Sequence, residues 1–222
     1  MDDSRRPETY LTPHQRRILF VAQVGILSVY LVTNRLLSHL GGGITFDIWL
    51  DHHIPLWPIW IVPYLLTLVW WGVALVWAYL KMKDSLYVAF AIGWLSACLI
   101  GYTFFVVCPN YMVRPEVTGT TWADWLVQFI YSSDRTYNAF PSQHLWNTVL
   151  IALFWSQWQP RWRQLIWVFT VIVALSTVFT RQHWILDVIG GISLGVVGYF
   201  AGLAIEARLR PLPRRRPSRA SQ

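Results

Sequence analysis

Two histidines and one aspartate in the second half of the chain have the types and spacing needed for nucleophilic and acid–base catalysis. His183 and Asp187 are four residues apart, so on a helix they share one face. A carboxylate that accepts a hydrogen bond from one imidazole nitrogen fixes the tautomer and leaves the other nitrogen free to attack. His144 lies on a different segment and could protonate a leaving oxygen, then deprotonate water or an alcohol. We predict that His183, His144 and Asp187 are catalytic.

Two arginines and a serine could hold an anion beside this group. Arg114 and Arg181 are candidates because guanidinium groups stay charged and match phosphate oxygens in a two-pronged geometry. Pro141 and Ser142 indicate the start of a helix, whose free amides and positive dipole end favour an anion. Either arginine could instead anchor to lipid headgroups. Two arginines together with two histidines favour a phosphate site, so we predict that Arg114, Ser142 and Arg181 bind phosphate.

A second cluster of possible ligands consists of Asp51, His52 and His53. These residues could suggest a metal, but adjacent residues rarely supply a complete ligand set. We predict neither a metal nor another cofactor.

The elements that must position these side chains are membrane helices. Of the 222 residues, 55% are hydrophobic and only 13% are charged, whereas soluble domains carry about 25% charged residues. The net charge of +7 comes largely from basic residues before the first apolar segment and after the last one. That placement is typical of membrane proteins and argues against a nucleic-acid partner.

Six apolar segments are candidates for the roughly 20-residue spans that a membrane requires. They are approximately residues 18–37, 57–80, 86–107, 143–159, 164–180 and 184–206. The last segment carries Gly191, Gly195, Gly198 and Gly202 on the same stripe as Asp187, and small residues at this spacing let membrane helices pack closely. We therefore predict an all-α, polytopic bundle of six transmembrane helices, with the Asp187 face turned into the bundle.

The distribution of Lys and Arg predicts how the chain crosses the membrane. With both termini on one side, 14 of the 18 Lys and Arg residues lie on that side and four on the other. Short cytoplasmic loops carry an excess of basic residues, so we predict that both termini are cytoplasmic. The groups around Arg114, Ser142 and His183 then share the outer face, although the count of spans did not assume this. We expect a multi-pass protein of the plasma (inner) membrane.

A short helix is predicted within the outer connection, residues 108–142. Thr121 and Asp124 fit a capping box at its start. One apolar face follows at helical spacing, made by Trp122, Trp125, Leu126, Phe129 and Ile130. We predict an interfacial helix on the outer side of the membrane, and the alternative is a helix packed on the protein itself.

Three groups of residues resemble the signature blocks of the type 2 phosphatidic acid phosphatase superfamily, which includes lipid phosphatases and haloperoxidase-like enzymes. They are Arg114-Pro115, residues 141–144, and His183 with Asp187, and the resemblance covers roughly residues 86–206.

The resemblance implies a role for each matched residue. In that family the histidine of the third block forms a phosphohistidine and the histidine of the second block is the acid and base. These positions correspond to His183 and His144, with Asp187 orienting His183. The resemblance also implies that Ser142, Arg114 and an arginine of the third block hold the phosphate, and that no metal is needed.

The sequence departs from the family pattern at three positions. Val107 and Gln143 stand where the first and second blocks usually have lysine and glycine, and Thr177 stands where the third usually has arginine. Arg181 lies two residues before the histidine of the third block instead. Residues 180–191 are similar to the branch that contains inositol phosphorylceramide synthases, which includes phosphotransferases as well as hydrolases.

We therefore expect a membrane-embedded lipid phosphatase that hydrolyses a lipid phosphate or pyrophosphate through a phosphohistidine at the outer membrane face. One alternative is a phosphotransferase that moves a phospho-headgroup from a lipid donor to an alcohol acceptor. A non-catalytic membrane scaffold or transporter is the other. We expect residues 1–17 to be a cytoplasmic segment, 18–206 the membrane domain and 207–222 a basic cytoplasmic tail, with lipid phosphate and membrane lipids as partners.

Overall fold

The computed structural model describes residues 10–210, and over this range the chain is helical without any β-strand. The predicted all-α fold is thereby confirmed. The longer helices are α1 (Pro13–Gly25), α2 (Leu27–Leu40), α3 (Ile61–Lys81), α4 (Asp84–Val107), α5 (Trp122–Ser133), α6 (Gln143–Trp158), α7 (Arg163–Phe179) and α8 (Ile185–Leu209). Short 3₁₀ helices occur at η2 (Trp49–His53), η3 (Pro58–Trp60) and η4 (Pro160–Trp162).

Five helical segments of the described range are long and apolar enough to cross a membrane, which identifies a multi-pass membrane protein. They are Pro13–Leu40, Pro58–Lys81, Asp84–Val107, Pro160–Phe179 and Ile185–Leu209. Helix α6 occupies the place of the predicted fourth span, but its 16 residues fall short of the roughly 20 that a crossing needs. The count of six spans therefore stays a prediction.

The first apolar segment begins earlier than the sequence pattern predicts. The hydroxyl of Thr12 accepts a hydrogen bond from the Gln15 N–H at 3.2 Å, and the Gln15 side chain accepts one from the Thr12 N–H at 2.9 Å. This reciprocal cap starts α1 at Pro13, and α2 continues it to Leu40 after a break at Ile26. The ends of the predicted terminal segments, 1–9 and 211–222, lie outside the described residues.

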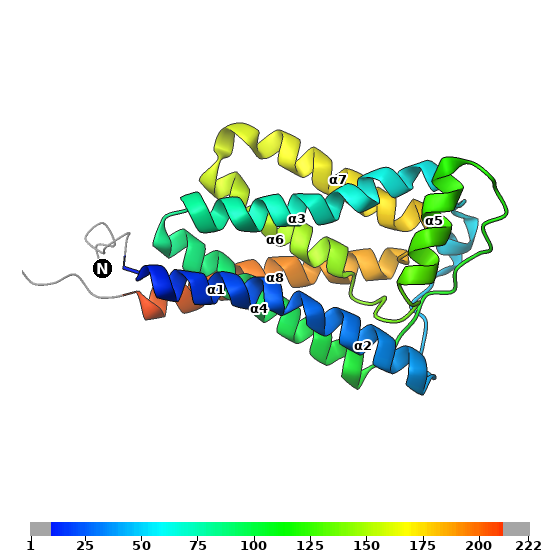
Figure 1. Ribbon diagram of the computed structural model, residues 1–222, viewed down its shortest axis with the longest axis horizontal. Coiled ribbons are helices and arrows are strands. Elements are labelled where there is room, and N and C mark those ends of the chain that lie inside the picture. Colours follow the sequence, from blue (N-terminus) through cyan, green and yellow to red (C-terminus); the bar gives the residue numbers. More distant parts are fainter. Residues whose placement is uncertain (1–9, 211–222) are drawn as a thin grey trace, which may run out of the picture.

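The glycine stripe of α8 faces into the bundle, as predicted. It packs there against α4 and α6, and the three helices lie side by side in Figure 1. A methyl group at Gly191 or Gly195 would come within 3.0 Å of a backbone oxygen of α6, and one at Gly198 or Gly202 within 3.0 Å of a backbone oxygen of α4. The absence of side chains on this face lets the backbones approach closely.

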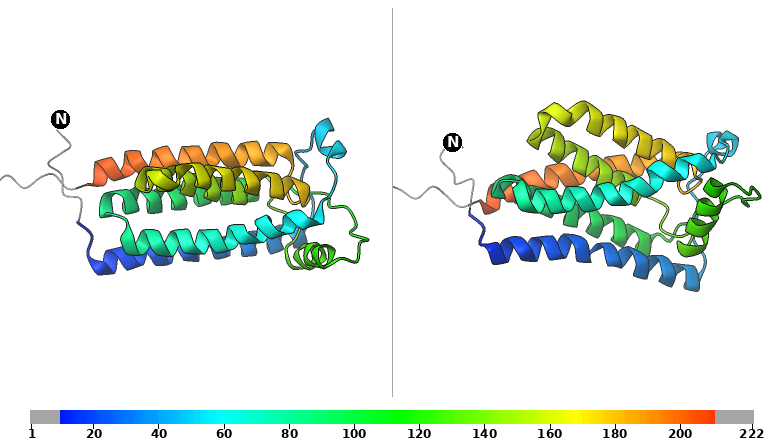
Figure 2. Two further views of the ribbon diagram at one scale, coloured as in Figure 1. Left: turned by 90° about the horizontal axis from the view of Figure 1, so that it is seen from above. Right: turned by 45° about the horizontal axis from the view of Figure 1, so that its top comes forward.

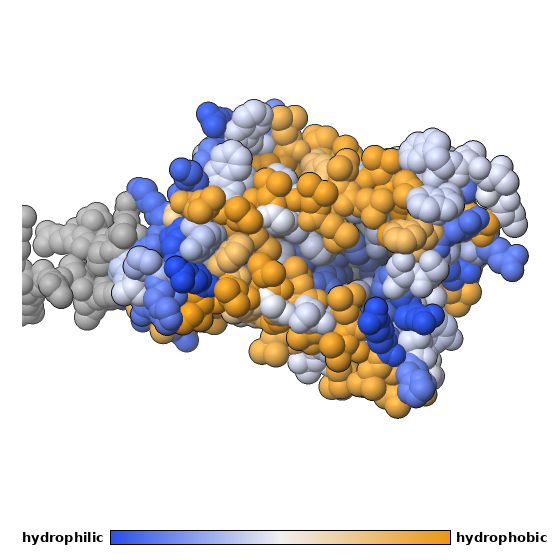
Figure 3. Space-filling view, in the orientation of Figure 1, coloured by the Kyte–Doolittle hydropathy of each residue, from blue (hydrophilic) through white to orange (hydrophobic). Residues whose placement is uncertain are grey.

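Large aromatic side chains fill the space between these helices. Trp94, Trp146, Phe90 and Phe154 are fully buried in one continuous core. The outer surface of the bundle is also apolar, and Figure 3 shows hydrophobic residues along its length with polar residues gathered toward both ends. An apolar belt between two polar ends is the surface expected of a protein within a bilayer.

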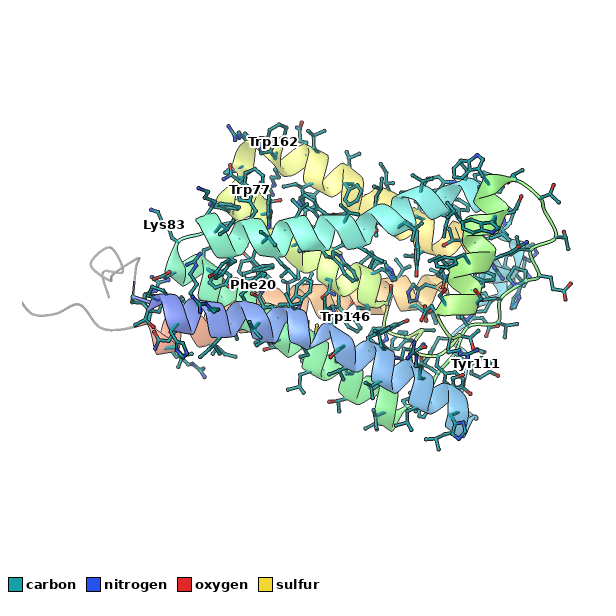
Figure 4. All side chains as sticks on the ribbon, viewed as in Figure 1. Phe20, Trp77, Lys83, Tyr111, Trp146 and Trp162 are labelled. Atoms are coloured by element: carbon teal, nitrogen blue, oxygen red, sulfur yellow. The ribbon has the colours of Figure 1, made fainter. Side chains whose placement is uncertain are left out.

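Helix α5 lies across one end of the bundle in every view of Figures 1 and 2. Its predicted capping box is present, since the Thr121 hydroxyl accepts from the Asp124 N–H and Asp124 accepts from the Thr121 N–H. The helix buries Val127 against Ile61 and Tyr64 and leaves its two tryptophans exposed. Tyr111 lies at this same end in Figure 4, whereas Trp77, Trp162 and Lys83 lie toward the opposite end. We call the end that carries α5 the site end.

The opposite end of the bundle holds both ends of the described chain. The Tyr10 hydroxyl donates to Glu206 at 2.9 Å, and the Arg16 guanidinium donates to the Asp84 carboxylate at 2.6 Å. The chain therefore enters and leaves the bundle at the end far from α5 (Figure 1).

Candidate active site

Helix α6 begins beside the start of α8 and carries His144 in its first turn. Ser142 is the N-cap residue, as the sequence pattern predicts, and its backbone N–H donates to the carbonyl oxygen of Asp187 at 2.9 Å. The Ser142 side chain does not cap the helix. Its buried hydroxyl has no hydrogen-bond partner within residues 10–210.

His183 lies in the turn before α8 and not on the helix itself, which corrects the expectation of a shared helix face. Its backbone N–H donates to the carbonyl oxygen of Thr177 at 3.1 Å, which closes the turn after α7. One oxygen of Asp187 accepts from the Trp184 N–H at 2.8 Å and lies 3.5 Å from the His183 Nδ1. Asp187 thus caps α8 while its side chain lies close enough to the imidazole for an ion pair, although the His183 Nδ1 makes no hydrogen bond within residues 10–210. The catalytic role of the pair stays a prediction.

The two histidines face each other across a small cavity at the site end. Their ring centroids are 5.6 Å apart, and the ring planes meet at 63°, an edge-to-face arrangement. The lining also includes Arg114, Tyr64 and Asp134. The cavity volume of about 10 Å³ is close to the least that holds one water molecule, so a phosphate can enter only when the lining moves.

Arg114 lies almost entirely buried at the edge of this cavity. It donates from Nη1 to the carbonyl oxygen of Asp134 at 2.7 Å and from Nη2 to the side-chain oxygen of Gln182 at 2.5 Å. Its guanidinium also stands over the Tyr131 ring at 4.8 Å. The Nε–H has no acceptor in the part of the chain that the structure describes, so one donor is available to an anion.

Arg181 points away from the cavity. Its guanidinium donates to the carbonyl oxygen of Asp51 at 2.6 Å and stands over the Trp184 ring at 4.8 Å. It therefore ties the loop that contains η2 to the turn between α7 and α8. Three of the six predicted site residues line the cavity: His144, His183 and Arg114. Asp187 lies behind the His183 ring. The side chains of Ser142 and Arg181 do not line the cavity.

Asp134 is a cavity residue that the sequence analysis missed. Its carboxylate accepts from the Tyr30 hydroxyl at 3.2 Å and lies 3.5 Å from the Arg114 Nη2. Burial raises the pKa of the Asp134 carboxyl, although Arg114 and the Tyr30 hydroxyl act in the opposite direction. Its position, directly after the amphipathic helix α5, was a signal that could have singled it out.

The alternative histidine cluster lies on the η2 loop. His52 is 2.9 Å from the Asp47 carboxylate, and His53 is 3.0 Å from the carbonyl oxygen of Trp49. Within residues 10–210, no group of three or more His, Cys, Asp or Glu side chains is arranged to hold a metal ion.

Comparison with known proteins gives a family match over more than half of the chain. The model of the PAP2 superfamily matches residues 84–210, from the start of α4 to the end of α8. No solved structure matches the chain.

Two curated relatives cover part of the chain. A protein of Escherichia coli (strain K12) named "Putative undecaprenyl-diphosphatase YbjG" is 27% identical over 140 residues, which is 62% of this chain and 63% of that protein. The uncharacterized protein MJ0662 of Methanocaldococcus jannaschii is 31% identical over 120 residues, which is 53% of this chain and 46% of that protein. The chain thus matches less than two thirds of the length of either relative.

Proposed function

The chain belongs to the PAP2 superfamily, and from this premise we propose that it is a membrane-embedded lipid phosphatase that hydrolyses a lipid phosphate or pyrophosphate. One observation carries the proposal. His144 and His183 face each other across a cavity with Arg114 at its edge, and Asp187 lies behind His183. These are the nucleophile, the acid and base, and the anion-binding group that phosphoryl transfer through histidine needs.

The proposed reaction has two steps. In the first, the His183 nitrogen that faces away from Asp187 attacks phosphorus, the bond from phosphorus to the lipid oxygen breaks, and protonated His144 gives its proton to that oxygen. In the second, the oxygen of a water molecule attacks the phosphohistidine while His144 takes the water's proton. The phosphorus–nitrogen bond then breaks and phosphate leaves. Asp187 holds the His183 ring and stabilises the positive charge that the ring carries in both steps.

Arg114 is the principal phosphate-binding side chain in this proposal, because its buried Nε–H has no acceptor among the described residues. The Ser142 hydroxyl and the amides at the start of α6 supply further donors on the neighbouring side. Arg181 could join them only by leaving the carbonyl oxygen of Asp51, so we assign it a lesser part.

We propose that the site faces the outer side of the plasma (inner) membrane. This proposal includes six spans with α6 as the fourth, an interfacial α5 and cytoplasmic termini. The support is the 14-to-4 distribution of basic residues and the position of both described chain ends opposite the site. The exposed Trp122, Trp125 and Phe129 on α5 are side chains that favour a membrane interface.

The test incubates the purified protein with a panel of lipid phosphomonoesters and diphosphates and measures released phosphate. The panel includes undecaprenyl diphosphate because of the name of the Escherichia coli relative. We expect release from at least one substrate, and loss of release in His183→Ala and in His144→Ala. His53→Ala is the matched control, since His53 contacts Trp49 on the η2 loop and does not line the cavity, and this variant should stay active. Activity that survives in His183→Ala would refute the phosphohistidine route.

A second candidate, phosphotransfer to an alcohol, is favoured by the polar lining of the cavity. Tyr30, Asp134, Thr136 and Asn138 line it together with the two histidines, and such side chains could hold an acceptor hydroxyl. A phospholipid labelled in its headgroup phosphate separates the two reactions. Label that moves into a new lipid when inositol, a sugar or ceramide is added identifies a transferase, and label released as water-soluble phosphate identifies a phosphatase.

A further inference from the structure

The two histidines of the site are held in different ways. His183 lies against a carboxylate, that of Asp187. His144 makes no ion pair with any described residue. Its buried Nδ1, like that of His183, has no hydrogen-bond partner in that part of the chain, so the difference lies in the neighbouring carboxylate. Some other feature must hold the His144 ring and offset the cost of charging it away from water.

Aromatic rings of α3 supply that feature. The His144 ring centroid lies 4.4 Å from that of Tyr64 and 5.5 Å from that of Trp71. Both pairs of rings are tilted, with interplanar angles of 32° and 39°, and both centroid distances are short enough for the imidazole to reach the aromatic ring. Both aromatic side chains are buried, and they stand seven residues apart on the same face of α3.

Each aromatic ring is itself fixed in place. The Trp71 indole N–H donates to the Thr148 hydroxyl at 3.1 Å, one helical turn beyond His144 on α6. Tyr64 is packed in the small cluster with Ile61 and Val127 under α5. The Trp71 ring is therefore held beside His144 by a hydrogen bond to α6 itself, and the Tyr64 ring is held by its packing against α5.

A cation within about 6 Å of an aromatic ring centroid is attracted by the negative face of that ring. His144 carries a positive charge whenever it is ready to protonate a leaving oxygen or has just deprotonated water. We propose that Tyr64 and Trp71 are positioning residues for His144, which orient its imidazole and stabilise its protonated form through their ring faces. This inference rests on the proposed function, in which His144 is the acid and base.

The two aromatic residues lie in a part of the chain that the family match does not cover. Tyr64 and Trp71 precede residue 84, where the match begins. The segment before α4 therefore contributes to the chemistry of the site as well as to the bundle.

The test compares Tyr64→Phe, which keeps the ring face, with Tyr64→Leu, which removes it. Tyr64→Leu should lower kcat by about tenfold, within a range of roughly 2- to 30-fold, and leave KM nearly unchanged. Tyr64→Phe should stay within about twofold of the unaltered protein. Equal losses in the two variants would overturn the inference, because the hydroxyl and not the ring face would then be responsible.

A measurement that needs no activity separates this inference from the proposed function. The titration of the His144 ring is followed by NMR in histidine-labelled protein, and its midpoint should fall by about half to one pH unit in Tyr64→Leu but not in Tyr64→Phe. The other ionisable groups at the cavity are the same in every variant: His183, Arg114, Asp134, Tyr30 and Tyr137.

Val127→Ala is the matched control, because it loosens the cluster around Tyr64 without removing a ring from His144. It should lower the thermal unfolding temperature and leave the midpoint unchanged. A midpoint that is the same in Tyr64→Leu and in the unaltered protein would refute the inference even if lipid phosphate is hydrolysed. A protein that hydrolyses no lipid phosphate but shows the expected midpoint shift would remove the proposed function and leave the effect of the rings on His144 established.

Discussion

The pairing of His183 with Asp187 leads to the first prediction at the scale of single residues. His183→Ala should abolish phosphate release, because the attacking nitrogen is lost. Asp187→Asn should keep the cap on α8, since an amide oxygen can still accept from the Trp184 N–H, but should lower kcat by roughly 10²- to 10⁴-fold through the wrong tautomer. Single-turnover assays with labelled lipid phosphate, together with acid-labile label on the protein, measure both effects. An Asp187→Asn variant of full activity would show that the carboxylate does not orient His183.

The donor set of the cavity leads to a second prediction, that activity does not depend on a divalent metal. The positive charge of Arg114 repels a metal cation. The two nearby carboxylates already have partners: Asp134 interacts with Arg114 and Tyr30, and Asp187 interacts with His183. We expect the rate to survive dialysis against chelators. Vanadate should inhibit, because it adopts the five-coordinate geometry of the transferring phosphoryl group. A complete loss in chelator that added magnesium or zinc restores would contradict this prediction.

From residue types and spacing, we could predict which residues meet at the site better than we could predict which neighbours contact them. His144, His183 and Arg114 could be predicted as a group because each stands beside the end of an apolar segment, and counting the predicted segments puts these ends on one side. The direction of the Arg181 side chain could not, since it depends on a loop more than 120 residues earlier in the chain. The position of Tyr64 beside His144 could not be predicted either. In the sequence Tyr64 is one of many apolar or aromatic residues of a span, and only the packing of α3 on α6 brings it to His144.

At the scale of helices, hydropathy predicted where segments lie, and capping decided where they begin. Thr12 and Gln15 start α1 five residues before the predicted span, and Asp187 caps α8 so that His183 is left in the preceding turn. The glycine stripe of α8 was predictable because small residues at helical spacing have few other uses in a membrane helix. Its partners, α4 and α6, were not, since any neighbouring helix could have filled that role.

The close approach of α8 to α6 leads to a third prediction. Gly195→Ala should destabilise the protein by about 1–3 kcal/mol, because the new methyl group would come within 2.8 Å of the Trp146 carbonyl oxygen and 3.0 Å of Val149. It should also lower activity, since α6 carries His144. Thermal unfolding in detergent and phosphate release measure the two effects.

Gly72→Ala is the control for this experiment. A methyl group at Gly72 on α3 meets nothing within 4 Å, so the substitution should be neutral or stabilising by up to about 1 kcal/mol. Equal destabilisation by the two substitutions would contradict this prediction, because a methyl group that meets no neighbour would then cost as much as one pressed against α6.

At the scale of the whole molecule, the bundle separates the candidate site from the end that holds both ends of the described chain. At the site end lie α5, the η2 loop and the starts of α6 and α8. Two residues that line the cavity there, Tyr30 and Tyr64, precede the region of the family match. The opposite end is held by ion pairs and hydrogen bonds among Arg16, Asp84, Glu206 and Tyr10. Because the apolar belt lies between these ends, the orientation of the bundle decides which leaflet supplies the substrate.

The last prediction concerns which end of the bundle faces the cytoplasm. In a background of Cys98→Ala and Cys108→Ser, single cysteines are placed at Thr118, in the exposed connection before α5, and at Gln159, in the turn between α6 and α7. The excess of Lys and Arg in the segments at the opposite end should hold those segments in the cytoplasm. An impermeant maleimide applied to intact cells should therefore label the cysteine at 118, and should label the cysteine at 159 only after the membrane is opened. The reverse pattern would place the site at the cytoplasmic face, and the substrate would then have to come from the inner leaflet.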